Sequence, residues 1–182
     1  MKNETVADCE KLPANFNPEG CCKFPSMGDE ATIAKITEQF KDQKLDEYMT
    51  ECKVSEAMFK EMKLVKDNAI DKDALLKYMD TNLKEANWKP VMKTAVEECY
   101  KEITATKDEI VKQLSIAPFN INKDKCNVLF MSMITCVHLE GFENCPKDVW
   151  TEEKRCTDAK AWITKCEDSI DSMKQLSNNR RK

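Results

Sequence analysis

Glycine and histidine are scarce in this chain. Only three glycines and one histidine occur among its 182 residues. So few glycines argue against a turn-rich β-sandwich or barrel, and they leave no glycine-rich loop to cradle a phosphate. With His138 as the single histidine, no set of nucleophile, base and metal ligands can be assembled, so we expect no enzyme, no metal and no cofactor. Because His138 stands in the most apolar stretch, it is expected to be a core or pocket-lining residue.

Long apolar runs and long basic runs are also missing. No apolar run reaches the roughly 18 residues of a membrane span, so membrane insertion is not expected. The densest basic group is the terminal Arg180-Arg181-Lys182, and the net charge is −4, which argues against a nucleic-acid partner. The chain opens on polar sequence, so we expect that a secretion signal was removed before Met1.

Cysteine, by contrast, is abundant. An even number spread over the whole chain predicts five disulfides and an oxidising, extracellular compartment. The spacings do not suit structural zinc, which favours pairs two to four residues apart. Ten cysteines allow about 945 pairings, so the connectivity cannot be derived. The ten are Cys9, Cys21, Cys22, Cys52, Cys99, Cys126, Cys136, Cys145, Cys156 and Cys166.

Beyond residue 28, the spacing of apolar residues is helical. An aspartate at 29, and another at 71 or 73, can cap helices, Pro90 suits a first helical position, and Thr106 with Glu109 forms a capping box. The segment 125–139 is apolar on every side, which is typical of a central buried helix. The expected helices lie near 29–40, 45–59, 71–83, 90–103, 106–114, 125–139 and 157–173.

These elements predict an all-α fold of six to seven short helices around an internal hydrophobic cavity, cross-linked by disulfides, with N- and C-terminal extensions. We expect residues 1–182 to form one domain. Residues 1–28 form an irregular arm, because they hold three of the six prolines and three cysteines. Residues 29–145 are the helical core, and 146–182 are an extension with one further helix.

Three features of the cysteine pattern are distinctive: the spacing Cys126-x₉-Cys136-x₈-Cys145-Pro146 with two further cysteines after it, the run Cys21-Cys22-Lys23-Phe24-Pro25, and the segment Asn87-Trp88-Lys89-Pro90 leading to Cys99. In these features the chain resembles insect odorant-binding proteins, and specifically their Plus-C subfamily. The chain departs from the family at one point. The family places two cysteines on one helix with three residues between them. Here Cys52 stands alone, with Tyr48 and Glu56 four residues to either side. The family's pairing is therefore not carried over.

The resemblance implies a secreted helical carrier that holds a small hydrophobic ligand in an internal cavity. Ten methionines suit a pocket that must accept varied shapes. A homodimer and an olfactory receptor are partners that the sequence leaves open. So is ligand release at low pH, through His138 or a buried carboxylate. The alternative is a secreted interaction module with a solid core. From the apolar faces that should converge on the central helix, the expected lining residues are Leu76, Met79, Val91, Met92, Phe119, Phe130, Met133, Ile134 and Val137.

Overall fold

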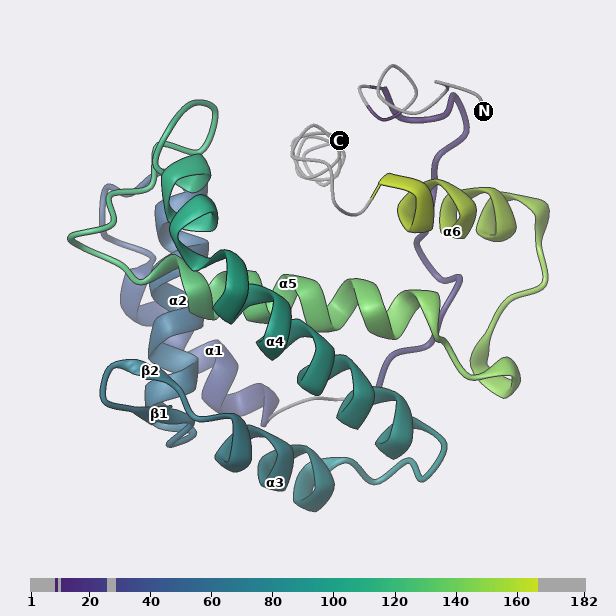
Figure 1. Ribbon diagram of the computed structural model, residues 1–182, viewed down its shortest axis with the longest axis horizontal. Coiled ribbons are helices and arrows are strands. Elements are labelled where there is room, and N and C mark those ends of the chain that lie inside the picture. The colour runs from purple at the N-terminus through teal and green to yellow at the C-terminus, as the bar shows by residue number, and fades with distance from the viewer. Residues whose placement is uncertain (1–8, 10, 26–28, 167–182) are drawn as a thin grey trace. The chain divides into compact units, whose positions relative to one another are not determined.

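The computed structural model describes residues 9, 11–25 and 29–166 (Figure 1). The chain divides into two compact units. Residues 25–138 form one unit, and residues 1–24 with 139–182 form the other. The six α-helices of these described residues confirm the predicted all-α class, and all ten cysteines are paired.

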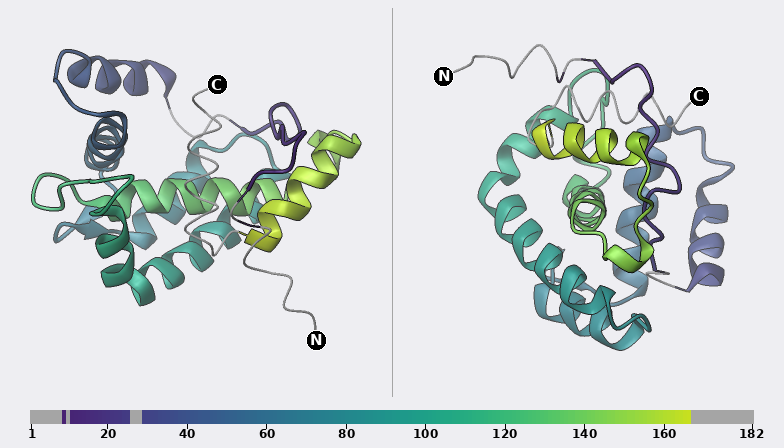
Figure 2. Two further views of the ribbon diagram at one scale, coloured as in Figure 1. Left: turned by 90° about the horizontal axis from the view of Figure 1, so that it is seen from above. Right: turned by 90° about the vertical axis from the view of Figure 1, so that its right-hand side faces the viewer.

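The unit of residues 25–138 contains most of the helices. Helix α3 lies alongside α4, as Figure 2 also shows, and α1 packs against α2. The elements are α1 (Glu30–Phe40), α2 (Glu47–Glu61), β1 (Val65–Lys66), β2 (Ala69–Ile70), α3 (Lys72–Asn82), α4 (Trp88–Leu114) and the greater part of α5 (Val128–Glu143).

Aspartate caps open three of these helices. The side chains of Asp29, Asp46 and Asp71 accept hydrogen bonds from backbone N–H groups in the first turns of α1, α2 and α3, at 3.1, 2.8 and 3.0 Å. Each cap satisfies one of the four amide groups that the first turn of a helix leaves without a partner. The predicted starts of the helices after Asp29 and Asp71 are confirmed.

Helix α4 differs from the prediction at both of the signals that were used to place it. It begins at Trp88, two residues before Pro90, because proline is tolerated throughout the first turn. It also kinks at Thr106, where a φ of −115° and a ψ of 15° are not helical values, so α4 consists of two helices that meet at this residue. The Thr106 hydroxyl donates back to the carbonyl of Glu102 instead of capping a new helix. A second helix therefore follows Thr106, as predicted for 106–114, but Thr106 does not cap it.

A short β-hairpin, which was not predicted, joins α2 to α3. Val65 pairs with Ile70, and Lys66 pairs with Ala69. The two turn residues between them, Asp67 and Asn68, both have positive φ, at 51° and 59°. This is the type I′ geometry that suits the twist of a two-residue hairpin.

Helix α5 is buried on all sides along its first half. Phe130, Met131, Ser132 and Met133 are consecutive and all buried, and four residues exceed one full turn. The prediction of a central buried helix is thus confirmed for this segment, although the helix begins at Val128 rather than residue 125. His138 is exposed, so the expectation of a core or pocket-lining histidine was wrong. His138 lies on the outward side of α5, beyond the turn of Phe130 to Met133 that is fully buried.

The other unit combines the N-terminal arm with the C-terminal elements. It contains the end of α5, the 3₁₀ helix η1 (Lys147–Val149) and α6 (Lys154–Cys166). Helix α6 begins three residues before the predicted start at Thr157, and its predicted continuation to Met173 lies outside the described residues. The described part of the arm holds no helix, as expected from its prolines.

Candidate ligand-binding site

The ten cysteines form five disulfides, which confirms the predicted number. Within residues 25–138, the pairs are Cys52–Cys126 and Cys99–Cys136. In the other unit, the pairs are Cys9–Cys166, Cys21–Cys156 and Cys22–Cys145. No bridge crosses from one unit to the other.

The two bridges of the unit 25–138 join helices whose buried faces meet. Cys99 on α4 is bonded to Cys136 on α5, and Cys52 on α2 is bonded to Cys126, two residues before α5 begins. Cys52 and Cys99 are fully buried. Covalent links from α2 and α4 towards α5 therefore hold this core together without relying on side-chain packing alone.

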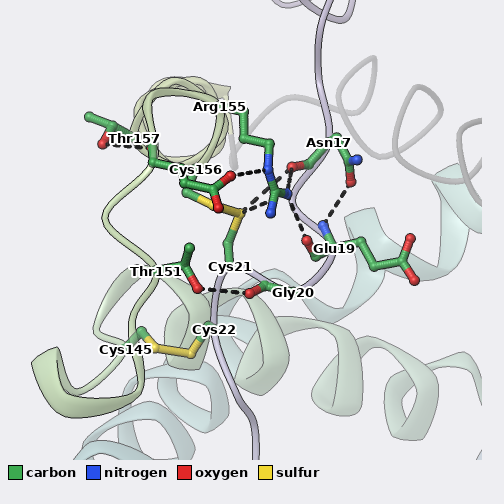
Figure 3. The surroundings of a disulfide bond; sticks show 11 residues. Asn17, Glu19, Gly20, Cys21, Cys22, Cys145, Thr151, Arg155, Cys156 and Thr157 are labelled. Atoms are coloured by element: carbon green, nitrogen blue, oxygen red, sulfur yellow. Dashed lines mark hydrogen bonds and ion pairs between the residues drawn. A yellow bond between two sulfur atoms is a disulfide. The ribbon is translucent and has the colours of Figure 1, made fainter.

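In the other unit, the arm is fastened to α6 by hydrogen bonds as well as by disulfides (Figure 3). Arg155 Nη1 donates to the carbonyl oxygens of Asn17 and Glu19, at 3.0 and 2.8 Å. The Thr151 hydroxyl donates to the carbonyl of Gly20 at 3.0 Å. These contacts satisfy carbonyl groups of an irregular segment that has no secondary structure to pair them.

Most of the predicted lining residues lie in the buried core of residues 25–138. The buried ones are Met79, Met92, Phe119, Phe130, Met133 and Val137. The other three, Leu76, Val91 and Ile134, are half-buried. Two of the buried rings belong to aromatic pairs: Tyr48 with Phe119 at 4.9 Å and Phe59 with Phe130 at 5.1 Å between ring centroids.

The interior of this unit carries almost no polar chemistry. Among its described residues, the buried serines are Ser55 and Ser132, and the buried rings of Tyr48 and Trp88 add one phenol and one indole N–H. Each serine hydroxyl donates to the carbonyl four residues earlier on its own helix, at 2.8 and 3.0 Å. The donor capacity of both serines is therefore used within the helices, and no buried side chain among the described residues of this unit carries a charge.

Methionine is prominent in the same interior. Of the seven methionines that the structure describes, five are buried, all within residues 25–138. They are Met49, Met79, Met92, Met131 and Met133. The unbranched thioether side chain adapts to irregular spaces, so a core built around it can rearrange at small cost.

A surface recess of about 260 Å³ lies between the end of α2 and α3, and it includes none of the nine predicted lining residues. It was missed because residues of the turn that follows α2 line it together with α3, and apolar periodicity does not predict that turn. The recess is lined by Met62, Lys63, Leu64, Ala74, Lys77, Tyr78, Thr81 and Asn82.

Two further properties concern the described residues only. No group of three or more His, Cys, Asp or Glu side chains is arranged there to hold a metal ion. No helix in this part of the chain is both long enough and apolar enough to cross a membrane.

A family model described as AgamOBP47-like matches residues 25–162. The chain belongs to this family of insect odorant-binding proteins. It is 23% identical to general odorant-binding protein 68 of Anopheles gambiae over 173 residues, which cover 92% of this chain and 79% of the relative. Odorant-binding protein 47 of the same mosquito is 24% identical, over 85% of this chain and 71% of its own length. General odorant-binding protein 67 is 27% identical, over 80% and 71%. The predicted Plus-C odorant-binding family is confirmed.

Proposed function

We propose that this odorant-binding protein is a secreted, non-catalytic carrier, and that it takes a small hydrophobic ligand into the core of residues 25–138. The observation that carries the proposal is the composition of that core, which is apolar, rich in methionine and free of charge. Family membership supports the same function, since the relatives are named odorant-binding proteins. Five disulfides fit the oxidising extracellular space into which such a carrier is released.

The chemistry of the core limits the ligand class. Without a charged side chain inside, binding must come mainly from apolar area removed from water. A ligand that buries about 300 Å² gains roughly 7–8 kcal/mol at about 25 cal/mol per Å². That gain, before the cost of association is subtracted, corresponds to a dissociation constant near 1 μM. We therefore expect neutral or weakly polar ligands with micromolar or weaker affinity.

The nine residues named from the sequence remain our proposed lining. Those that are buried now would contact a ligand after methionine side chains change rotamer. Met92 on α4 and Met133 on α5 are the strongest candidates, because both are at most 1% exposed and belong to helices joined by the Cys99–Cys136 bridge. Opening space in a packed core costs stability, and the disulfides offset part of that cost.

Displacement of a fluorescent apolar probe tests this function. The oxidised protein is saturated with a naphthylamine dye and titrated with alcohols, aldehydes and aromatics of increasing length. We expect saturable micromolar uptake and displacement that depends on ligand length. Absence of uptake by a monodisperse, fully oxidised sample would refute the carrier and favour an interaction module with a solid core.

A matched pair of variants tests whether the dye and the alcohols bind in this core. Met92→Ala enlarges the proposed cavity, so the preferred alcohol should become longer, whereas Met58→Ala on α2 alters a half-buried methionine outside the proposed lining and should leave the preference unchanged. An identical length preference in wild type and Met92→Ala would exclude this core as the site.

A further inference from the structure

We propose that the recess between α2 and α3 is a second binding site, separate from the apolar core, and that it takes a small aliphatic carboxylate. Three properties of this recess support such a site: its charge, the backbone of one lysine and an unpartnered phenol. The proposed site goes beyond the carrier function, because a ligand in the apolar core would need none of these groups.

The recess has apolar residues at its base and lysines at its edge. Leu64 is 3% exposed, and Met62 and Ala74 are half-buried, while the side chains of Lys63 and Lys77 are exposed. Together, these features match an aliphatic chain that ends in an anion. At about 260 Å³, the recess is slightly smaller than pockets for drug-sized molecules, so the ligand is a small one.

The charge of the recess is opposite in sign to that of the chain. Its lining includes two lysines and no acidic residue, although the net charge of the whole chain is −4. Within the described part of the chain, neither Lys63 nor Lys77 makes an ion pair, whereas Lys60 pairs with Glu56 and Lys89 pairs with Asp80. Both ammonium groups are therefore available to a carboxylate.

The backbone of Lys63 is the second observation. Its φ is +58°, in the left-handed region that favours glycine. The Lys63 N–H donates to the Lys60 carbonyl at 3.1 Å, and the Leu64 N–H donates to the Phe59 carbonyl at 2.8 Å. These two bonds form a Schellman motif, whose left-handed position is usually glycine. A lysine at this position places its positive charge beside the recess, although its backbone is strained there. Strained backbone positions are concentrated at ligand-binding sites.

Tyr78 supplies a hydrogen-bond donor. Burial first, and the Asp29 carboxylate second, raise the pKa of Tyr78, so its phenol stays protonated at neutral pH. The phenol oxygen has no hydrogen-bond partner among the described residues. Asp29 itself is ionised, since hydrogen bonds from the Thr32 hydroxyl and the Ala31 N–H lower its pKa. Because this negative charge lies near Tyr78, a monocarboxylate is favoured over a dianion.

The test compares octanoate with 1-octanol by NMR titration of the oxidised full chain labelled with ¹⁵N. We expect octanoate, and not octanol, to shift the amide signals of Leu64, Ala74 and Tyr78. Added salt should weaken this binding, because the lysines are exposed. Shifts confined to the core helices, or no shift at all, would overturn the proposal.

Lysine variants make the test specific. Lys63→Gly should weaken octanoate binding by about three-fold and Lys63→Gly with Lys77→Gln by about ten-fold, while Lys101→Gln on α4 should have no effect. Glycine suits the left-handed position, so the first variant keeps the fold. Unchanged affinity in the double variant would refute the site.

The two proposals fail separately. If the dye enters the core but octanoate ignores both lysines, the carboxylate site is refuted and the carrier stands. If octanoate binds in the recess and the protein takes up no dye, the carrier is refuted and the site stands. Displacement of dye by octanol should be the same in wild type and in the double lysine variant.

Discussion

Within the described part of the chain, four residues other than glycine have positive φ, and they differ in how well their side chains tolerate it. Asp67, Asn68 and Asn120 belong to the residue types that visit the left-handed region most readily. Lys63 does not, because its Cβ crowds the following carbonyl without any short polar group to compensate. At this one residue, local preference and the adopted backbone conflict, so a substitution can separate stability from binding.

Lys63→Gly is expected to stabilise the protein. Relief of the left-handed strain is worth about 1–2 kcal/mol, and the extra freedom of glycine in the unfolded chain removes about 0.4–1 kcal/mol of this. The free energy of unfolding, measured by guanidinium chloride denaturation at constant pH, should therefore rise by about 0.5–1 kcal/mol. A decrease would show that Lys63 is not strained. Asn120→Gly serves as the control and should change stability less.

Arg155→Met tests the contacts that fasten the arm. The variant keeps the aliphatic stem but removes the donors to the carbonyls of Asn17 and Glu19. Because the side chain is 33% exposed, we expect a loss of about 1–2 kcal/mol rather than the full value of a buried charged hydrogen bond. Amide exchange in residues 17–23 should quicken. Lys154→Met, which removes only the exposed pair with Asp158, should cost less than about 0.5 kcal/mol.

At the scale of elements, the cap of α1 is expected to respond to pH. Hydrogen bonds from the Thr32 hydroxyl and the Ala31 N–H lower the pKa of Asp29 below 3.8. The stabilisation from this cap is therefore complete above pH 3.8 and is lost as the pH falls through the lowered pKa. Carbon-13 shifts of the first turn of α1, followed from about pH 5 to about pH 2, should report fraying in wild type.

Asp29→Asn provides the matched comparison for this titration. Asparagine also caps helices but does not titrate, so the first turn of α1 should keep its shifts throughout the acid range. If wild type and variant fray together, the loss of helix comes from some other carboxyl group and not from the cap.

Helices with a clear cap and a one-sided apolar face could be predicted from the sequence, and others could not. Asp29 and Asp71 mark true helix starts, because each carboxylate satisfies a first-turn amide. The capping-box pattern at Thr106 marked a true boundary between two helices, but the threonine hydroxyl donates to the backbone carbonyl of Glu102 and does not cap the second helix. The hairpin of residues 65–70 has strands of only two residues, too short for any periodicity to emerge.

At the scale of the whole molecule, adjacent cysteines make two disulfides partly redundant. Cys21 is bonded to Cys156 and Cys22 to Cys145, so both bridges close nearly the same loop of 135 or 123 residues. When one is removed, the other still holds the ends together, and only a short additional loop is released. Replacing Cys22 and Cys145 by serine should therefore cost about 3 kcal/mol, not the nearly 5 kcal/mol of an isolated long loop.

Denaturation of the oxidised double-serine protein measures that cost, with the Cys21–Cys156 pair removed in a second variant for comparison. Similar losses in the two variants support the redundancy. A loss of about 5 kcal/mol for either one alone would contradict it.

Family and fold class were accessible from the sequence because chained cysteine spacings are specific. The disulfide pairing could not be predicted, because ten cysteines allow about 945 pairings and only the folded backbone selects one of them. For the lining, apolar periodicity found the buried faces of α3, α4 and α5, but periodicity does not distinguish a side chain that lines a cavity from one in a solid core. The recess was beyond prediction, because it depends on the left-handed turn at Lys63.

The carrier claim is tested most directly by methyl NMR of the oxidised protein labelled with ¹³C at its ten methionines, titrated with 1-octanol. The account predicts saturable shifts of the buried Met92 and Met133 methyl groups, with little change at Met58 and Met62. Shifts restricted to exposed methionines, or none at a concentration that displaces the dye, would show that the core of residues 25–138 does not hold the ligand.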